Sequence, residues 1–218
     1  MPILSSIGAS SAKAFGFTAS SAGPLIIGQA YKGGFFAGQI STAGNGVADY
    51  NLVIAPKSSG ENPTAQWKTS NTSTSGTSSV IDGPTNSANM NDASHPAAQF
   101  CEGLTIGGFS DWYMPAKNEL EVCYYNLKPT TQSNNTFSGS NTNAVPKRTA
   151  NYSAGIPSQT SATDFQTGNT EAFATSSHFC STEYSATNAW VQVFSNGNQT
   201  NLAKDLARYV RAVRRIAV

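Results

Sequence analysis

Four carboxylates are the residues of this chain that could most directly perform chemistry. Asp111, Glu119, Glu121 and Glu183 could supply the pair of carboxylates that glycoside cleavage requires. Asp111, however, lies in a turn, where we expect it to accept hydrogen bonds. Glu119 and Glu121 come early in a predicted helix, where acidic side chains interact favourably with the helix dipole. The sequence therefore favours a structural role for these carboxylates over a catalytic one.

The histidines and cysteines show no catalytic or metal-binding pattern. His95 precedes a proline and His178 stands alone, so neither has an obvious acid or nucleophile beside it. Cys101, Cys123 and Cys180 follow no metal-ligand spacing and cannot all pair. We interpret them as buried free thiols, with a disulfide as the alternative. We therefore expect no enzyme, no metal and no cofactor.

The composition predicts a neutral surface that is rich in hydrogen-bonding groups. Charged residues make up 11% of the 218 residues, against about 25% in an average globular protein, and the net charge is +1. Such a balance gives no indication of a nucleic-acid partner or of an anionic membrane. No segment approaches the ~20 apolar residues that span a bilayer, so we expect no membrane insertion.

Residues 107–127 are expected to form the centre of the fold. A Gly-Gly turn leads into an apolar cluster that includes Trp112, and Pro115 suits the first position of a helix. Leu120 and Leu127 recur at helical spacing, which predicts a helix over 115–127. Another helix is predicted over 87–104, where Pro96 would bend it or split it in two. Trp112 is assigned to the core.

Strands are predicted on both sides of these helices. Residues 25–40 read as strand, turn and strand around a Gly-Gly pair, and residues 50–56 form a third strand. Two more strands are expected at 189–194 and 209–218, with a hairpin turn at Asn196–Gly197. The segments at 60–89 and 130–173 are long polar loops. Loops of that length inside a domain are usually functional or held by tertiary contacts.

Alternation along residues 189–194 divides their side chains between two faces. Trp190, Gln192 and Phe194 share one face, and Val191 and Val193 share the other. We assign Trp190 and Phe194 to the core, which leaves the valine face for display. Near the C-terminus, four arginines are expected to pair with Asp205, Glu183 or backbone carbonyls: Arg208, Arg211, Arg214 and Arg215.

The first 24 residues differ in character from the rest. They are rich in Ser, Ala and Gly, with isolated apolar residues, and they lack the basic region and the continuous apolar run of a secretory signal. Such a segment is too apolar for a free linker, yet it cannot bury enough surface to order itself alone. We interpret residues 1–24 as an arm that attaches to a partner, with a frayed tail as the alternative.

The order of motifs resembles one protein family. Four motifs follow one another: GGFSDWYMPAKNEL at 107–120, the Ser181–Glu183 segment, the Trp190–Phe194 strand with its Asn-Gly turn, and YVRAVRR at 209–215. They are similar to the C-type-lectin-like domains at the ends of bacteriophage tail-fibre proteins, which are akin to the major tropism determinants and, more distantly, to formylglycine-generating-enzyme-like folds. The resemblance covers residues 25–218. Where relatives usually carry Tyr-Trp-Ser, this chain has His178, Phe179 and Cys180.

The resemblance implies an α+β domain with two helices packed on small antiparallel sheets, long irregular loops, and both ends of the domain in one sheet. It also implies a non-catalytic tail fibre or tip protein in the virion, assembled in the bacterial host cytoplasm. Its implied partners are a host receptor (a glycan or an outer-membrane protein), two further copies in a homotrimer, and a tail or baseplate protein bound by residues 1–24. The alternatives are a structural tail or capsid decoration protein and a bacterial surface adhesin.

The receptor site is expected at residues 178–202, because surfaces built from Tyr, Ser, Gly and Asn combine rigid contact area with adaptable hydrogen bonds. The candidate residues are Phe179, Tyr184, Asn188, Val191, Val193, Asn198, Thr200 and Asn201. For Phe179 and the two valines, the alternative is a place in the core or in a subunit contact. The chain has neither a Glu-Pro-Asn nor a Trp-Asn-Asp triplet, so we expect binding without calcium.

Overall fold

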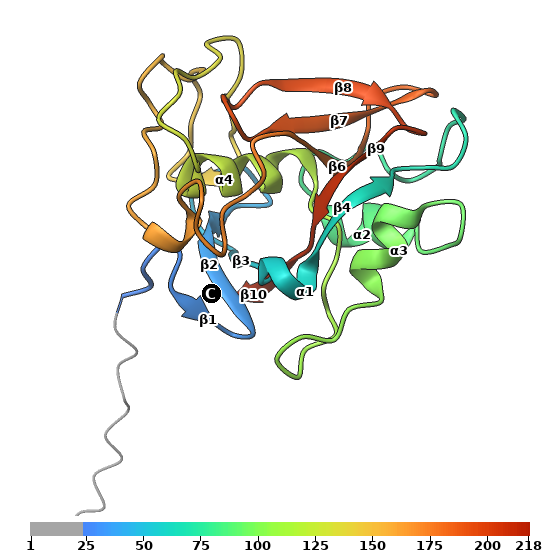
Figure 1. Ribbon diagram of the computed structural model, residues 1–218, viewed down its shortest axis with the longest axis horizontal. Coiled ribbons are helices and arrows are strands. Elements are labelled where there is room, and N and C mark those ends of the chain that lie inside the picture. Colours follow the sequence, from blue (N-terminus) through green and yellow to red (C-terminus); the bar gives the residue numbers. More distant parts are fainter. Residues whose placement is uncertain (1–23) are drawn as a thin grey trace, which may run out of the picture.

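The computed structural model describes residues 24–218 (Figure 1). Over this range the chain forms a mixed α+β fold with two five-stranded sheets. The elements in chain order are β1 (Ala30–Tyr31), β2 (Gly34–Ile40), β3 (Tyr50–Ile54), α1 (Lys57–Gly60), β4 (Glu61–Gln66), α2 (Gly83–Ala88), α3 (Pro96–Glu102), α4 (Lys117–Leu127), β5 (Ala144–Val145), a 3-10 turn (Thr163–Phe165), β6 (Ser177–Glu183), β7 (Asn188–Val193), β8 (Gln199–Ala203), β9 (Ala207–Arg211) and β10 (Val213–Ala217). The predicted arm lies almost entirely outside the described residues.

The first sheet brings the two ends of the domain together. Its strands run in the order β1-β2-β3-β10, and β5 pairs with β2. β10 pairs antiparallel with β3, so that Val213 lies opposite Ile54 and Ala217 lies opposite Tyr50. The prediction that both ends of the domain lie in one sheet is confirmed, as is the strand–turn–strand over 25–40, although its first strand is only two residues long.

The second sheet has the order β4-β9-β6-β7-β8. Its pairs are antiparallel except for β6 and β9, which run parallel where His178 lies opposite Tyr209. β7 and β8 form the hairpin that the Asn196–Gly197 pair predicts. Gly197 has a φ of 75°, a left-handed conformation that glycine adopts without a steric penalty.

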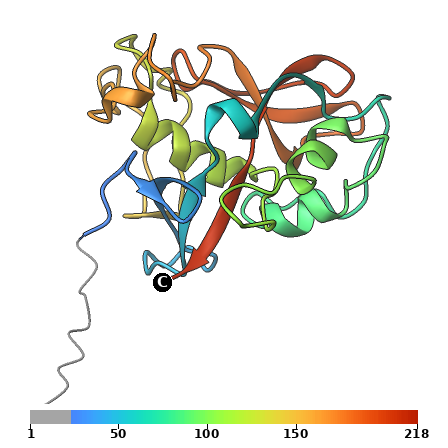
Figure 2. The same ribbon diagram turned by 60° about the horizontal axis from the view of Figure 1, so that its bottom comes forward.

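The predicted C-terminal strand over 209–218 is in fact two strands that belong to different sheets. β9 ends at Arg211 and β10 begins at Val213. Between them, Ala212 donates its N–H to the Gly60 carbonyl and accepts a hydrogen bond from the Ala55 N–H. Figures 1 and 2 show this segment leaving the second sheet and continuing beside β3. Alternation alone does not show where a strand changes sheet.

The sequence predicts α3 and α4, but the predicted loop over 60–89 in fact contains β4 and α2. α4 confirms the second predicted helix, although it begins at Lys117 and Pro115 lies before it. The predicted helix over 87–104 forms only in part. Residues 89–95 are not helical, and they separate α2, which ends at Ala88, from α3, whose first residue is Pro96. Proline fits that position because no helical partner exists for its missing N–H. α4 lies between the two sheets (Figure 1), where it contacts β2 of the first sheet and β6 and β7 of the second.

Two apolar clusters cover opposite faces of the second sheet. The cluster on the α4 side includes Leu120, Cys180 and Phe194, and Trp190 packs against it. The cluster on the other side includes Phe179 and Val191, together with Trp112. Because both faces of this sheet are covered, neither face of β7 is wholly available for display.

Candidate functional site

The structure divides the eight predicted receptor residues between the two faces of the second sheet. Residues directly opposite each other in a β-ladder point to the same side. Phe179 lies opposite Val191, and Val191 lies opposite Thr200. These three therefore face the cluster that contains Trp112, and Val193 and Asn198 follow by alternation. Asn188 and Asn201 face the other side, so the eight residues do not form one surface.

Two of the predicted residues are buried, which corrects the expectation that they are displayed. Phe179 is 0% exposed and Val191 is 1% exposed. The alternative that placed them in the core is the one the structure supports. Val193, Asn198 and Thr200 remain partly exposed on the same face. The Asn198 carbonyl accepts the Val193 N–H and so closes the hairpin.

Trp190 was assigned to the core, but its side chain lies partly exposed at the edge of the α4-side cluster. Phe194 is fully buried and Gln192 is 2% exposed on that same face. Alternation correctly separates the two faces of β7, but it does not show that other side chains of the protein pack against both faces. Trp190 therefore becomes available as a surface residue in place of Val191.

A partly exposed group that we call the aromatic patch consists of Tyr184, Asn188, Trp190 and Asn201. Tyr184 is 52% exposed and stands perpendicular to the Trp190 ring, with 4.9 Å between ring centroids. The Asn188 side-chain amide donates to the Asn201 side-chain oxygen at 2.6 Å across β7 and β8. Lys117, the first residue of α4, places its ammonium 4.3 Å from the Trp190 ring centroid. The patch is therefore a rigid ring pair beside polar side chains.

The C-terminal arginines pair with carboxylates that the sequence did not indicate. Arg211 pairs with Glu171, and Arg214 binds Asp111 with two nitrogens at 2.7 and 2.9 Å. Arg215 pairs with Glu119 at 2.8 Å. The expected partners Asp205 and Glu183 are wrong for these arginines.

The expectation of backbone carbonyl partners is confirmed for each of the four arginines: Arg208, Arg211, Arg214 and Arg215 donate to main-chain oxygens. Glu183 pairs instead with the buried ammonium of Lys204. We expected Asp111 to accept hydrogen bonds within its own turn, but its carboxylate forms an ion pair with Arg214 instead.

Both carboxylates in the first part of α4 are fully buried, which the helix-dipole interpretation did not predict. Glu119 accepts hydrogen bonds from the Ala116 N–H and the Tyr113 hydroxyl. Glu121 accepts from the Tyr152 hydroxyl at 2.6 Å and also pairs with Arg148. Burial raises the pKa of each carboxyl above its ordinary value, while the neighbouring arginine opposes that rise.

His95 has both an acid and a hydroxyl beside it, contrary to the sequence interpretation. Its Nδ1 lies 2.8 Å from Asp92 Oδ1, and its Nε2 lies 2.8 Å from Thr74 Oγ1. Lys68 donates to the same hydroxyl and to the carbonyls of Thr72 and Ser73. These contacts tie the loop after β4 to the start of α3.

His178 also has an acid nearby. Its Nε2 lies 3.9 Å from Glu61 Oε2, and the ring is completely buried among Phe173, Phe194 and Tyr209. Burial lowers the pKa of His178 below its ordinary value. These aromatic side chains therefore enclose the ring within the fold.

The cysteines match the sequence interpretation, because Cys101, Cys123 and Cys180 are free and buried. Within residues 24–218 no group of three or more His, Cys, Asp and Glu side chains is placed to hold a metal ion. No helix in the same range has the length and apolar character needed to cross a bilayer. Neither the protein-family models nor the curated proteins compared with this chain give a match.

Proposed function

We propose that this chain is a bacteriophage tail-fibre or tip protein with a C-type-lectin-like domain at residues 25–218, and that it binds a host surface receptor without catalysis. The motif order between residues 107 and 215 supports this proposal. The mixed α+β fold with both domain ends in one sheet is consistent with it. The near-neutral, Asn- and Ser-rich surface suits recognition by contact more than long-range electrostatic steering.

The observation that carries the proposal is the aromatic patch. Tyr184 and Trp190 offer large rings whose orientation is already fixed by edge-to-face packing, so little side-chain entropy is lost on binding. Asn188 and Asn201 add amide donors and acceptors beside the rings. Antibody paratopes likewise combine rigid aromatic rings with adaptable hydrogen-bonding side chains. We therefore assign the receptor site to this patch instead of to the buried Phe179 and Val191.

The assembly follows from the same proposal. A homotrimer would present three copies of the patch, and linked weak sites gain avidity without any new contact. Residues 1–24 would attach the domain to a tail or baseplate protein, which places the chain in the virion. The alternatives are a decoration protein without a receptor and a bacterial adhesin. Particles that lack this chain would adsorb normally if it were only a decoration.

The proposal is tested by adsorption of particles that carry variants of the patch. Tyr184→Ala and Asn201→Ala should each weaken binding by about 1–2 kcal/mol if the residue is an anchor, which is roughly a 5- to 30-fold change. Their melting temperatures should change little, because exposed substitutions usually stay within ~0.5 kcal/mol. Phe137→Ala is the matched control, since Phe137 is 89% exposed and lies outside the patch. Unchanged adsorption of both patch variants would refute the proposal.

A further inference from the structure

We propose that a groove around Tyr125 binds a neutral saccharide. The groove consists of two adjoining hollows, of about 370 Å³ and about 320 Å³, and both are lined by Tyr125 and Ile156. Each volume is within the range of small-ligand sites, about 300–1,000 Å³. None of the aromatic-patch residues lines either hollow, so this proposal does not depend on the proposed function.

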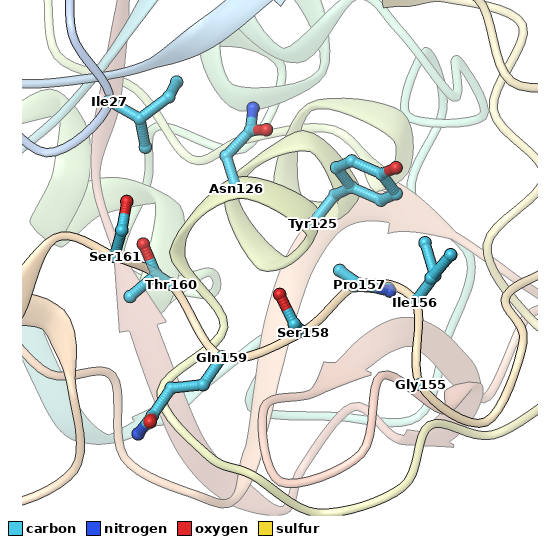
Figure 3. Close-up of a pocket in the computed structure, with 10 residues that line it drawn as sticks. All are labelled: Ile27, Tyr125, Asn126, Gly155, Ile156, Pro157, Ser158, Gln159, Thr160 and Ser161. Carbon is cyan, nitrogen blue, oxygen red and sulfur yellow. The ribbon is translucent and has the colours of Figure 1, made fainter.

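The two walls of the first hollow come from different parts of the chain. Figure 3 shows Tyr125 and Asn126, from the last turn of α4, facing the segment 155–161, with Ile156 and Pro157 below the Tyr125 ring. Asn126 is held in place because its side-chain amide donates to the Ala37 carbonyl at 2.7 Å. The hollow is therefore bounded by a helix on one side and by a loop on the other.

The Tyr125 ring is fixed before any ligand arrives. The Arg148 guanidinium stacks 3.8 Å from the centre of the Tyr125 ring. Arg148 is held in turn by the buried Glu121 carboxylate, which also accepts the Tyr152 hydroxyl. Arg148 covers one side of the ring, and the ring also lines the first hollow, which Arg148 does not line. There the ring presents a preorganised apolar surface, and preorganisation reduces the entropy lost on binding.

Two polar side chains at the groove are free to bind a ligand. Within the described part of the chain, the side chains of Asn151 and Ser158 make no hydrogen bond to protein, and both are exposed at the groove. Figure 3 shows the Ser158 hydroxyl directed toward α4. Arg148 uses Nη2 for Glu121, which leaves Nη1 available to an oxygen acceptor.

This combination favours a saccharide over other small ligands. A sugar ring has a C–H face that can lie on an aromatic ring, and hydroxyls at its rim that need donors and acceptors. The charge of Arg148 is balanced by Glu121, so an anionic ligand gains no net attraction. No other charged side chain lines the two hollows. The groove therefore suits a neutral sugar.

The full chain should be titrated separately with glucose, galactose, N-acetylglucosamine and glucuronate, with amide chemical shifts as the readout. We expect saturable shifts at residues 148–161 for at least one neutral sugar, with a Kd of about 1 mM, which is weak binding. Tyr125→Ala should weaken that binding at least tenfold, and Tyr184→Ala, outside the groove, should leave it unchanged. If Tyr125→Ala fails to fold, the exposed double variant Asn151→Ala with Ser158→Ala decides instead.

Three results would overturn the proposal. One is the absence of saturable shifts with every neutral sugar. Another is binding that persists unchanged in Tyr125→Ala or in the double variant. The third is tighter binding of glucuronate than of any neutral sugar, which would show that the Arg148 charge is not balanced. Loss of adsorption in Tyr184→Ala with normal sugar binding would leave both proposals standing, so the two can fail separately.

Discussion

Replacing Glu121 by glutamine tests the buried carboxylate that joins α4 to the loop carrying Arg148 and Tyr152. Glu121 is 0% exposed and receives hydrogen bonds from the Tyr152 hydroxyl, from the Asn141 amide at 2.5 Å and from Arg148. Glutamine has nearly the same shape, so the domain should still fold. However, it keeps one acceptor oxygen and presents an N–H₂ group to side chains that need to donate.

The cost can be worked out from these partners. Well below pH 4.5 the carboxyl is protonated in both the folded and the unfolded state, so both side chains are uncharged. The difference is then one buried donor of the glutamine that is left without an acceptor. Such a group costs about 1–3 kcal/mol. In a domain of this size each kcal/mol shifts the melting temperature by about 2–4 °C. We therefore expect Glu121→Gln to melt roughly 2–12 °C below the unaltered protein in acid.

The pH dependence of stability shows which effect on Glu121 is larger, the cost of burying its charge or the attraction of Arg148. Burial raises the folded-state pKa of Glu121 above its ordinary value of 4.5, against the attraction of Arg148. A raised pKa means that the stability linked to the protonated carboxyl is complete below pH 4.5 and is lost as the pH rises through the folded-state value. The glutamine variant has no such proton. Its stability deficit should therefore shrink as the pH rises from 4.5.

Urea unfolding of both proteins between pH 4 and 8 measures this difference directly. A deficit that grows with rising pH would refute the reasoning, because it would show that the Arg148 attraction outweighs the cost of burying the charge. A deficit independent of pH would show that the pKa of Glu121 does not change on folding.

Two further predictions concern the hairpin turn and the thiols. Gly197→Ala should destabilise the fold by about 2–5 kcal/mol, because the new Cβ would clash with the Tyr124 ring in addition to the left-handed backbone cost. Gly168→Ala is the control, since Gly168 has a φ of 95° and open space around it and so carries only the backbone cost. Equal losses of unfolding free energy in the two variants would contradict this prediction. Burial raises the pKa of Cys180 to about 11, so a thiol reagent at pH 8 should label the native protein slowly and all three cysteines only after unfolding; rapid labelling of Cys180 in the native state would show that it is not buried.

Local signals in the sequence predicted the local structure well. The apolar spacing indicated α4, Pro96 marked the start of α3, and the Asn196–Gly197 pair indicated the hairpin. Each of these features depends on neighbouring residues only. The C-type-lectin-like assignment depends on the resemblance and stays a proposal.

The candidate site was harder to predict because it depends on contacts between distant residues. Alternation separated the faces of β7, but whether Phe179 and Val191 are covered depends on segments far away in the chain. The burial of Glu121 is equally hidden, because an acid in the first part of a helix usually faces solvent and its partner Arg148 lies in a polar loop. The composition of residues 130–173 gave one correct indication, since a loop of that length is usually functional or held by tertiary contacts.

The passage of one segment through both sheets has a consequence for the kinetics of folding. β9 pairs with β4 in one sheet and β10 pairs with β3 in the other, with Ala212 between them hydrogen-bonded to both Ala55 and Gly60. These pairings join residues far apart in sequence. The chain therefore loses the entropy of closing a long loop before the contacts between the strands stabilise it. Neither sheet is complete until the segment from β9 to β10 has paired. We expect slow folding with one rate-limiting step, in which both sheets close together.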